Sequence, residues 1–355
     1  MTTVFSVIFG ILIFSVLIFV HELGHFLAAK ASGVQVNEFA IFMGPAIFKK
    51  QGKETLYTIR CIPLGGYCAM EGEDEDTDNP RSFQKAVWWK RLIILVSGAL
   101  MNFLIGIVLF VIVAMPIQRL AVPVVSSVTA CCPNAHENQL MPGDRILEVN
   151  GETVFVSSDI SVLANVTGGY SHDFLVERNG RQILLEGITA HDHYEEGKKS
   201  SVRFGFSLSV EKPTFEDKLV HAWNLTIDNV RNVRLSLIML FTGKAGFQDM
   251  MGPVGLVSTM TDVAQQSKTW VDALLNMLYF GGFIAVNLGV MNLLPIPALD
   301  GGRVVGLLVT TAIEGVTKKK IDPKYEGYIH GAFMVLLLAL MAVVLFKDVF
   351  MIFKG

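Results

Sequence analysis

Residues 4–29 of the chain read VFSVIFGILIFSVLIFVHELGHFLAA. A mostly apolar run leads into three ionisable side chains, His21, Glu22 and His25, and the segment then continues apolar. About 20 consecutive apolar residues are enough to cross the ~30 Å hydrocarbon core of a bilayer. Because ionisable groups within a span are costly, they are candidates for function. The segment therefore predicts a membrane-spanning helix with a chemical site inside it.

The composition of the 355-residue chain supports a membrane protein. Hydrophobic residues make up 52% and charged residues 17% of the chain, whereas an average soluble domain has about 25% charged residues. The formal net charge of −3 gives no reason to expect nucleic acid as a partner. Three further segments have the length and apolarity of spans, at about 92–115, 271–294 and 328–350. The first segment lacks a basic start and a small-residue cleavage site, so we expect a retained helix and no signal peptide.

Lysine and arginine in the short loops predict the orientation of the spans. The loop between the first and second spans carries Lys30, Lys49, Lys50, Lys53, Arg60, Arg81, Lys85, Lys90 and Arg91. The loop between the third and fourth spans carries Arg303, Lys318, Lys319, Lys320 and Lys324. Both loops are expected to face the cytoplasm, so both termini and residues 117–270 are expected to lie outside. An acidic run over 71–78 counts little in this rule and indicates a solvated loop.

The long outer segment has two textures. Residues 122–210 contain short strand-like runs, and the pairs Asn150-Gly151 and Asn179-Gly180 lie between such runs. Asn-Gly accepts the positive φ angles of type I′ turns, so both pairs predict β-hairpins. The interpretation is four domains or regions: spans one and two over 1–116, a β-rich extracytoplasmic domain over 117–212, a helical linker over 213–270, and spans three and four over 271–355.

Within the linker, apolar residues recur at helical spacing over 215–240. They are Leu219, Trp223, Ile227, Val230 and Val233. Two interpretations stay open: an amphipathic helix that covers the core of a domain, or a helix that lies on the outer surface of the membrane.

The first span carries a metal-binding pattern. Histidines at positions i and i+4 lie one turn apart on one face of a helix, so His21 and His25 can share a Zn²⁺ ion. Glu22, beside them, can act as general base on a metal-bound water. The alternative is a helix that leaves the membrane at His21, with both histidines among the lipid headgroups. The apolar residues that follow His25 argue against that alternative.

A catalytic zinc needs three protein ligands and an open position, so a third ligand must come from another part of the chain. The third span ends in NLLPIPALDGG, residues 292–302, which contains Asn292, Pro295, Pro297 and Asp300. The two prolines end the helix and free backbone groups near the site. Asp300 is either the third ligand or an acid in a loop at the helix end. Asn292 is either a buried amide bonded to freed carbonyls or a group that binds the substrate backbone.

These two motifs together resemble the site-2 protease family of intramembrane zinc metalloproteases, and within it the bacterial RseP and RasP branch. Four more segments are similar to motifs of the family. Gly65–Tyr67 resembles the end of a membrane-associated β-hairpin, Ser97–Phe103 a second-span signature, and Met251–Gly255 a motif just before the third span. Ala135–Gly151 resembles the loop-helix-strand element of a single PDZ domain. The fold class that the resemblance implies is a polytopic α-helical membrane protein with four transmembrane helices, a cytoplasmic-side β-hairpin and one inserted β-rich domain.

The resemblance also implies residue roles. It makes His21, His25 and Asp300 the zinc ligands and Glu22 the catalytic acid and base. Substrate-binding roles fall to Asn292, Pro295, Pro297, Gly65 and Gly66.

It further implies a multi-pass protein of the bacterial cell membrane that cleaves single-span membrane proteins already shortened by another protease, such as anti-sigma factors, and signal-peptide remnants. Two rivals are a non-catalytic receptor that binds exposed C-termini through its PDZ-like domain and a metal transporter. The intact Glu22 argues against the receptor, and the scarcity of polar residues in spans two and four argues against the transporter. The substrate and the oligomeric state are not evident from the sequence.

The four cysteines predict no structural disulfide. Cys131 and Cys132 are neighbours, and neighbouring cysteines rarely form an unstrained bridge. Cys61 and Cys68 fall in the reducing compartment and are expected to be structural thiols.

Overall fold

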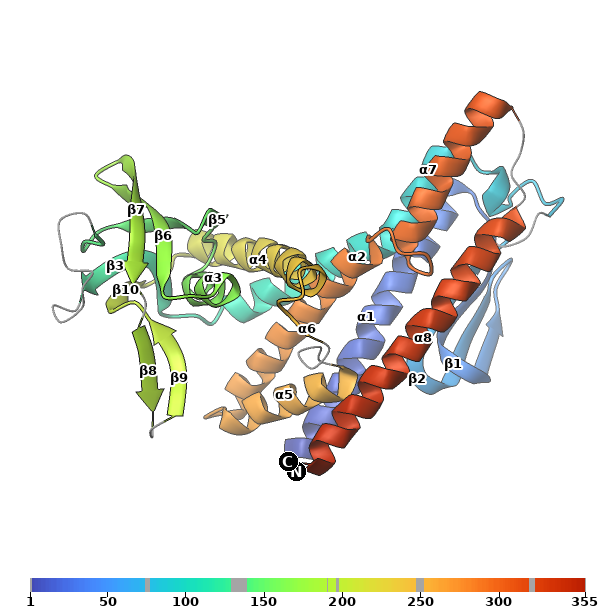
Figure 1. Cartoon of the computed structure of the whole chain (residues 1–355). Coiled ribbons are helices and arrows are strands. Elements are labelled where there is room, and N and C mark those ends of the chain that lie inside the picture. Colours follow the sequence, from blue (N-terminus) through green and yellow to red (C-terminus); the bar gives the residue numbers. More distant parts are fainter. Residues whose placement is uncertain are drawn as a thin grey trace. The chain divides into compact units, whose positions relative to one another are not determined.

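A computed structural model describes residues 2–73, 77–128, 139–189, 191–195, 198–246, 252–318 and 323–354 (Figure 1). Within these residues, four helices are long and apolar enough to cross a membrane. They are α1 (Thr2–Ser32), α2 (Trp88–Ala114), α6 (Trp270–Asn292) and α8 (Pro323–Lys354). The four predicted spans are therefore confirmed as helices. Residues 74–76 of the acidic run, Cys131-Cys132 and residues 135–138 of the PDZ-like element lie outside the described residues.

Local signals account for where these helices begin and end. The helix α2 ends at Ala114, two residues before Pro116, which cannot continue the helical hydrogen bonds. The helix α6 begins after Thr269, whose hydroxyl accepts from the backbone N–H of Asp272, and it ends three residues before Pro295. Capping by threonine satisfies a backbone donor that would otherwise lack a partner.

The chain divides into two compact units. The first contains residues 1–109 and 246–355, and the second contains residues 110–245. Besides most of the apolar helices, the first unit contains α5 (Pro253–Gln266), α7 (Asp300–Thr317), the short helix η1 (Phe83–Lys85) and the hairpin of β1 (Val36–Gln51) and β2 (Leu56–Met70). The helix α5 lies within the segment predicted as a helical linker, whereas α7 lies where a loop between the third and fourth spans was expected, so α7 is an addition to the predicted fold.

The β1–β2 hairpin is folded back on itself. Residues 38–41 pair with 56–59 on one side and with 66–69 on the other. Backbone at positive φ marks the bends, at Phe42 and Gly44 in β1 and at Gly65 in β2. The result is a sheet of four extended segments, called ribbons below, in the order 43–51, 56–62, 36–41 and 65–70. The β-hairpin that the resemblance implies for this loop is therefore present, and its last ribbon forms one edge of the sheet.

The cysteines of this hairpin differ in exposure. Cys61 is exposed and Cys68 is buried, and both are free thiols. Burial raises the pKa of the Cys68 thiol to about 12, so that thiol stays protonated at neutral pH and packs as a small apolar side chain.

The second unit contains a six-stranded antiparallel sheet, as far as the structure describes it. Its strands are β3 (Leu120–Val128), β4 (Arg145–Val149), β5 (Glu152–Thr153), β6 (Ser171–Arg178), β7 (Arg181–Thr189) and β10 (Phe206–Glu211). The helix α3 (Asp159–Thr167) packs on it, and β8 (His191–Glu195) with β9 (Lys198–Arg203) forms a separate hairpin. Phe174, Ile146 and Leu163 are each at most 1% exposed in the core. The inserted β-rich domain is therefore present.

Both predicted Asn-Gly turns form. Asn150 and Gly151 join β4 to β5, and Asn179 and Gly180 join β6 to β7, all four with φ between 52° and 77°. The pairing of Arg178 with Arg181 closes the second hairpin with a two-residue loop, which is the geometry that Asn-Gly favours.

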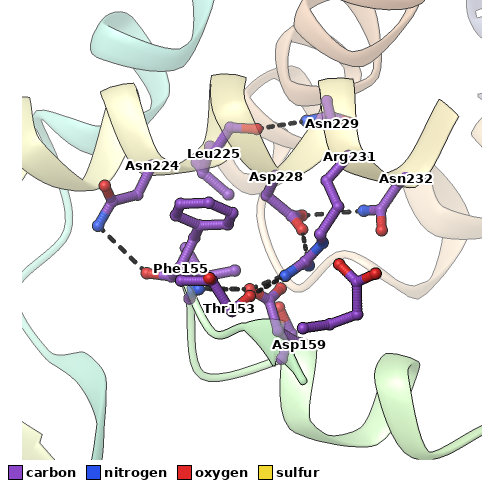
Figure 2. A network of polar contacts seen from close by, with 12 residues as sticks. Thr153, Phe155, Asp159, Asn224, Leu225, Asp228, Asn229, Arg231 and Asn232 are labelled. Atoms are coloured by element: carbon purple, nitrogen blue, oxygen red, sulfur yellow. Dashed lines mark hydrogen bonds and ion pairs between the residues drawn. The ribbon is translucent and has the colours of Figure 1, made fainter. Parts of the chain in front are cut away.

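The helix α4 (Phe215–Phe241) contacts this domain through a network of polar side chains (Figure 2). Arg231 bonds the backbone oxygen of Thr153 and forms ion pairs with Asp228 of its own helix and with Asp159 of α3, the latter at 3.1 Å. Asn224 donates to the backbone oxygen of Phe155 at 3.1 Å. Both carboxylates and the guanidinium are buried, so this is an ion-pair network and not an ordinary apolar interface.

For residues 215–240, the sequence left open whether the helix covers the core of a domain or lies on the membrane surface, and the packing supports the first interpretation for part of the helix. Val233 is buried and Leu235 belongs to the domain core, as expected of a helix that covers a core. Leu219 and Trp223, however, are 40% and 54% exposed. The predicted apolar stripe therefore divides between a buried and an exposed part.

Candidate active site

Three side chains from two distant segments converge in the first unit. His21 and His25 lie on α1, and Asp300 is the first residue of α7. The Nε2 atoms of the two histidines are 3.2 Å apart, and Oδ2 of Asp300 lies 3.2 Å from Nε2 of His21 and 3.4 Å from Nε2 of His25. His25 is buried and the other two side chains are less than one-fifth exposed. The set is a group of three potential metal ligands.

The donor chemistry fits a zinc ion. Oδ2 of Asp300 is buried and makes no hydrogen bond within the described residues, although two imidazole nitrogens lie at ion-pair distance. Such an arrangement leaves the lone pairs of three ligand atoms facing one another, which is unfavourable unless a cation lies between them. Two imidazoles and one carboxylate form one of the three-ligand sets that hold catalytic zinc.

The orientation of His25 is set by the backbone of α2. Nδ1 of His25 lies 2.8 Å from the carbonyl oxygen of Ile94. Because a carbonyl oxygen only accepts, Nδ1 carries the proton and Nε2 keeps its lone pair for a metal.

Glycines allow α1 and α2 to approach closely at this point. A Cβ at Gly98 would lie 2.7 Å from Cε1 of His21 and would clash with Nε2 of His25. A Cβ at Gly24 would lie 2.8 Å from Cγ of Met101 and would also clash with the carbonyl group of Ser97. The second-span signature therefore packs directly against the histidine motif.

The loop from α6 to α7 places Asp300. Gly301 and Gly302 pack against the backbone of residues 293–297 so closely that a side chain at either glycine would clash with it. Ala298 adopts φ = 82°, and its backbone N–H donates to Nδ1 of His330, on α8, at 2.9 Å. Pro295 and Pro297 lie in this loop, after the end of α6, so the predicted helix break is confirmed. Asp300 begins a helix and does not lie in a loop, because its neighbouring glycines permit this tight turn into α7.

Glu22 and the edge of the β-hairpin face each other. Glu22 lies on α1 between the two histidines and is half-buried. A Cβ built at Gly66 would be 3.6 Å from Cγ of Glu22 and 3.8 Å from Cγ2 of Ile18. Ser15 of α1 also donates to the backbone oxygen of Pro63 at 3.2 Å. The ribbon that contains Gly65 and Gly66 therefore lies alongside the helix of the histidine motif.

Two groups at the site escaped the sequence analysis. Asn102 was quoted only as part of a signature, yet its amide lies 3.3 Å from Nδ1 of His21. Asn292 reaches the same nitrogen at 3.5 Å. His330 was not considered at all. A histidine in an otherwise apolar span is a signal that could have found it.

Comparison with known proteins adds an independent line of evidence. Residues 9–340 match the model of peptidase family M50. A relative from Clostridium acetobutylicum, assigned to the zinc metalloproteases, is 37% identical over 346 residues, which are 97% of each chain. Regulator of sigma-W protease RasP of Bacillus subtilis is 28% identical over an alignment of 427 positions, which covers 97% of this chain and 98% of the relative. Zinc metalloprotease RasP of Geobacillus kaustophilus is 28% identical over an alignment of 435 positions, which covers 98% of each chain.

Proposed function

The chain belongs to peptidase family M50 and is a multi-pass membrane zinc metalloprotease, and on this premise we propose that its zinc is held by His21, His25 and Asp300 and that Glu22 is the catalytic acid and base. The observation that carries this assignment is the convergence of three ligand atoms within 4.8 Å of one another. Glu22 lies three residues before His25 on α1, so the two side chains are neighbours on the helix surface.

The proposed mechanism divides the work between the metal and the protein. When bound, Zn²⁺ supplies a Lewis acid that makes water a nucleophile at neutral pH. Glu22 accepts the proton of the attacking water and returns it to the amine nitrogen of the leaving peptide. His21, His25 and Asp300 hold the site in place, and the packed helices around them exclude bulk water.

We propose that the substrate binds as an extended strand. A transmembrane helix hides its peptide bonds, so it must unwind before attack. The ribbon 65–70 is an edge of the hairpin sheet within the described residues, and it lies beside Glu22. An edge presents unpaired backbone donors and acceptors, to which an extended peptide can add by strand pairing. Gly65 and Gly66 give that peptide close access, and Asn292, with Pro295 and Pro297, would bind its other side.

The substrates proposed are single-span membrane proteins. The Bacillus subtilis relative is named as a regulator of sigma-W, which supports trimmed anti-sigma factors as one substrate class, beside signal-peptide remnants.

The basic loops are proposed to face the cytoplasm, and residues 117–212 are proposed to form a PDZ-like domain on the outside. In that place the domain would select or exclude substrates, and 213–270 would be a helical linker. Membership in a peptidase family favours this enzyme over a non-catalytic receptor.

The test is cleavage by the wild type and Glu22→Gln in cells that co-express a set of tagged single-span proteins. The amide is nearly isosteric with the carboxylate but cannot accept a proton, so cleavage should fall at least ~10²-fold. Zinc content, measured on the purified proteins, should stay the same. Cleavage by Glu22→Gln within a few-fold of the wild type would remove Glu22 from the mechanism.

A further inference from the structure

Asn102 is a fully buried amide beside the metal site. It lies on α2, is 1% exposed, and places its amide 3.3 Å from Nδ1 of His21. Its other amide atom, Oδ1, is buried and has no hydrogen-bond partner within the described residues. A buried amide oxygen without a partner costs about 1–3 kcal/mol, so the arrangement calls for an explanation.

The chemistry of a metal-bound imidazole supplies one. Nε2 of His21 is the atom that faces His25 and Asp300. An imidazole that binds metal through Nε2 carries its proton on Nδ1, which must then donate a hydrogen bond. An amide NH₂ group cannot accept it. A rotation of the Asn102 carboxamide by 180° about its last torsion brings the unpaired Oδ1 to Nδ1, and the acceptor that His21 needs is then present.

We propose that Asn102 is the positioning residue of His21: its amide oxygen accepts the Nδ1–H hydrogen bond and thereby fixes the tautomer and the ring orientation of this ligand. The proposal deepens the metal site and rests on the proposed function. Asn292 also reaches Nδ1 of His21, but at 3.5 Å and from a half-buried position. Its NH₂ group therefore stays available for the substrate.

The placement on α2 supports this role. Ile94, Gly98 and Asn102 are spaced four residues apart, so they lie on one face of the helix. The Ile94 carbonyl orients His25, Gly98 admits both rings, and Asn102 reaches His21. One helix face thus supplies an acceptor to each of the two histidines: a backbone carbonyl, which no substitution removes, and a side-chain amide, which a substitution can remove.

The experiment measures zinc affinity by chelator competition on the full-length protein in detergent. Asn102→Leu and Asn102→Ala remove the acceptor with opposite changes in packing, and Asn102→Asp keeps an oxygen in its place. Loss of such a partner typically costs about 10- to 100-fold in metal affinity. We expect that loss for leucine and alanine, whereas the aspartate variant should stay within ~3-fold of the wild type or bind more tightly, since carboxylate–histidine–zinc arrangements are common.

Two controls separate positioning from folding. Asn276→Leu removes an amide of α6 that bonds Ser267, and it should leave zinc affinity unchanged. Thermal unfolding of the metal-free proteins should be the same for Asn102→Ala and the wild type if Asn102 acts on the bound metal.

Several results would overturn the proposal. It is wrong if both Asn102→Leu and Asn102→Ala bind zinc like the wild type, or if Asn102→Asp loses as much affinity as Asn102→Ala. It is also wrong if Asn102→Ala lowers the free energy of unfolding of the metal-free protein by as much as it lowers the free energy of zinc binding. A separate variant, His25→Ala, tests the site itself. If that variant still binds zinc as the wild type does, the proposed ligand set fails, whatever Asn102 does.

Discussion

Gly98 is the residue of α2 whose missing side chain admits both histidine rings. A methyl group there would overlap Nε2 of His25, one of the proposed ligand atoms, and would press on the ring of His21. The neighbouring α1 also approaches α2 at Gly24, so neither helix can retreat without opening the other contact.

Gly98→Ala is therefore expected to weaken zinc binding. Overpacking a tight site costs typically about 1–3 kcal/mol, which corresponds to roughly 5- to 150-fold in affinity if it falls on the metal-bound state. The matched control is Gly331→Ala, also in an apolar helix, where a Cβ would meet no atom within 4 Å. Equal zinc affinity of the two variants in the same chelator assay would contradict this expectation and would show that α2 shifts to accommodate the methyl group.

The hairpin edge and α4 are the two elements whose packing has consequences for function. The folded-back hairpin has two edge ribbons, 43–51 and 65–70, but only the second contains Gly66, beside Glu22. A substrate strand that adds to the sheet for cleavage should therefore use the second edge alone.

A photo-reactive amino acid at Ala69 should cross-link to a bound single-span substrate in the Glu22→Gln background, where the substrate is not consumed. The same group at Lys49, in the opposite edge ribbon, should not. The measurement is the yield of the cross-linked adduct on a gel. Equal yields at both positions, or adducts at Lys49 alone, would contradict strand addition at the 65–70 edge.

In α4, the Arg231 network is expected to make the stability of the packing against the β domain depend on pH. Burial, and then the nearby carboxylate of Asp159, raise the pKa of Asp228 to about 7. The unfolded chain has the ordinary value, 3.8, so between about pH 4 and 7 the folded state binds more protons than the unfolded state. Stability from this group is present at the low end of that window and is lost as the pH rises through 7.

Hydrogen exchange of α4 amides, corrected for the intrinsic pH dependence, should therefore show less protection at pH 8 than at pH 6. Asp228→Asn cannot ionise and should reduce that difference severalfold. Glu216→Gln, an exposed carboxylate on the same helix, should leave the difference as in the wild type. A pH effect that persists unchanged in Asp228→Asn would assign it to another group.

At the scale of the whole molecule, the proposed orientation in the membrane rests on the positive charges of the short loops. The proposed topology places Gly180, in the turn of the β6–β7 hairpin, and Lys53, in the turn between β1 and β2, on opposite sides of the membrane.

A reporter fused after Gly180 is expected to be active outside the cell, and one fused after Lys53 inside it. Alkaline phosphatase and a fluorescent protein, each tested at both positions, provide the measurement with its own internal control. A cytoplasmic signal at Gly180 would mean that all four spans have the orientation opposite to the proposed one and that the metal site lies nearer the outer face.

The sequence by itself determined the elements whose signals are local. Four apolar runs of sufficient length became helices, because a helix satisfies its own backbone in lipid whatever surrounds it. Both Asn-Gly pairs became hairpin turns, because positive φ is a property of those two residues. The spacing of His21 and His25 placed both rings on one face, because residues four apart lie one turn apart on a helix.

Only the tertiary structure decided what depends on contacts between distant residues. That Asp300, nearly 280 positions after His21, lies at ion-pair distance from it follows from how α1 and α7 pack, and no local pattern encodes that distance. The same holds for the groups of α2 that lie beside the two histidines and for the hairpin folded back beside Glu22. In α4, the apolar spacing was read correctly as a helix, but which face meets the domain was settled by Asp159, because a buried arginine must find its carboxylate partners wherever the fold provides them.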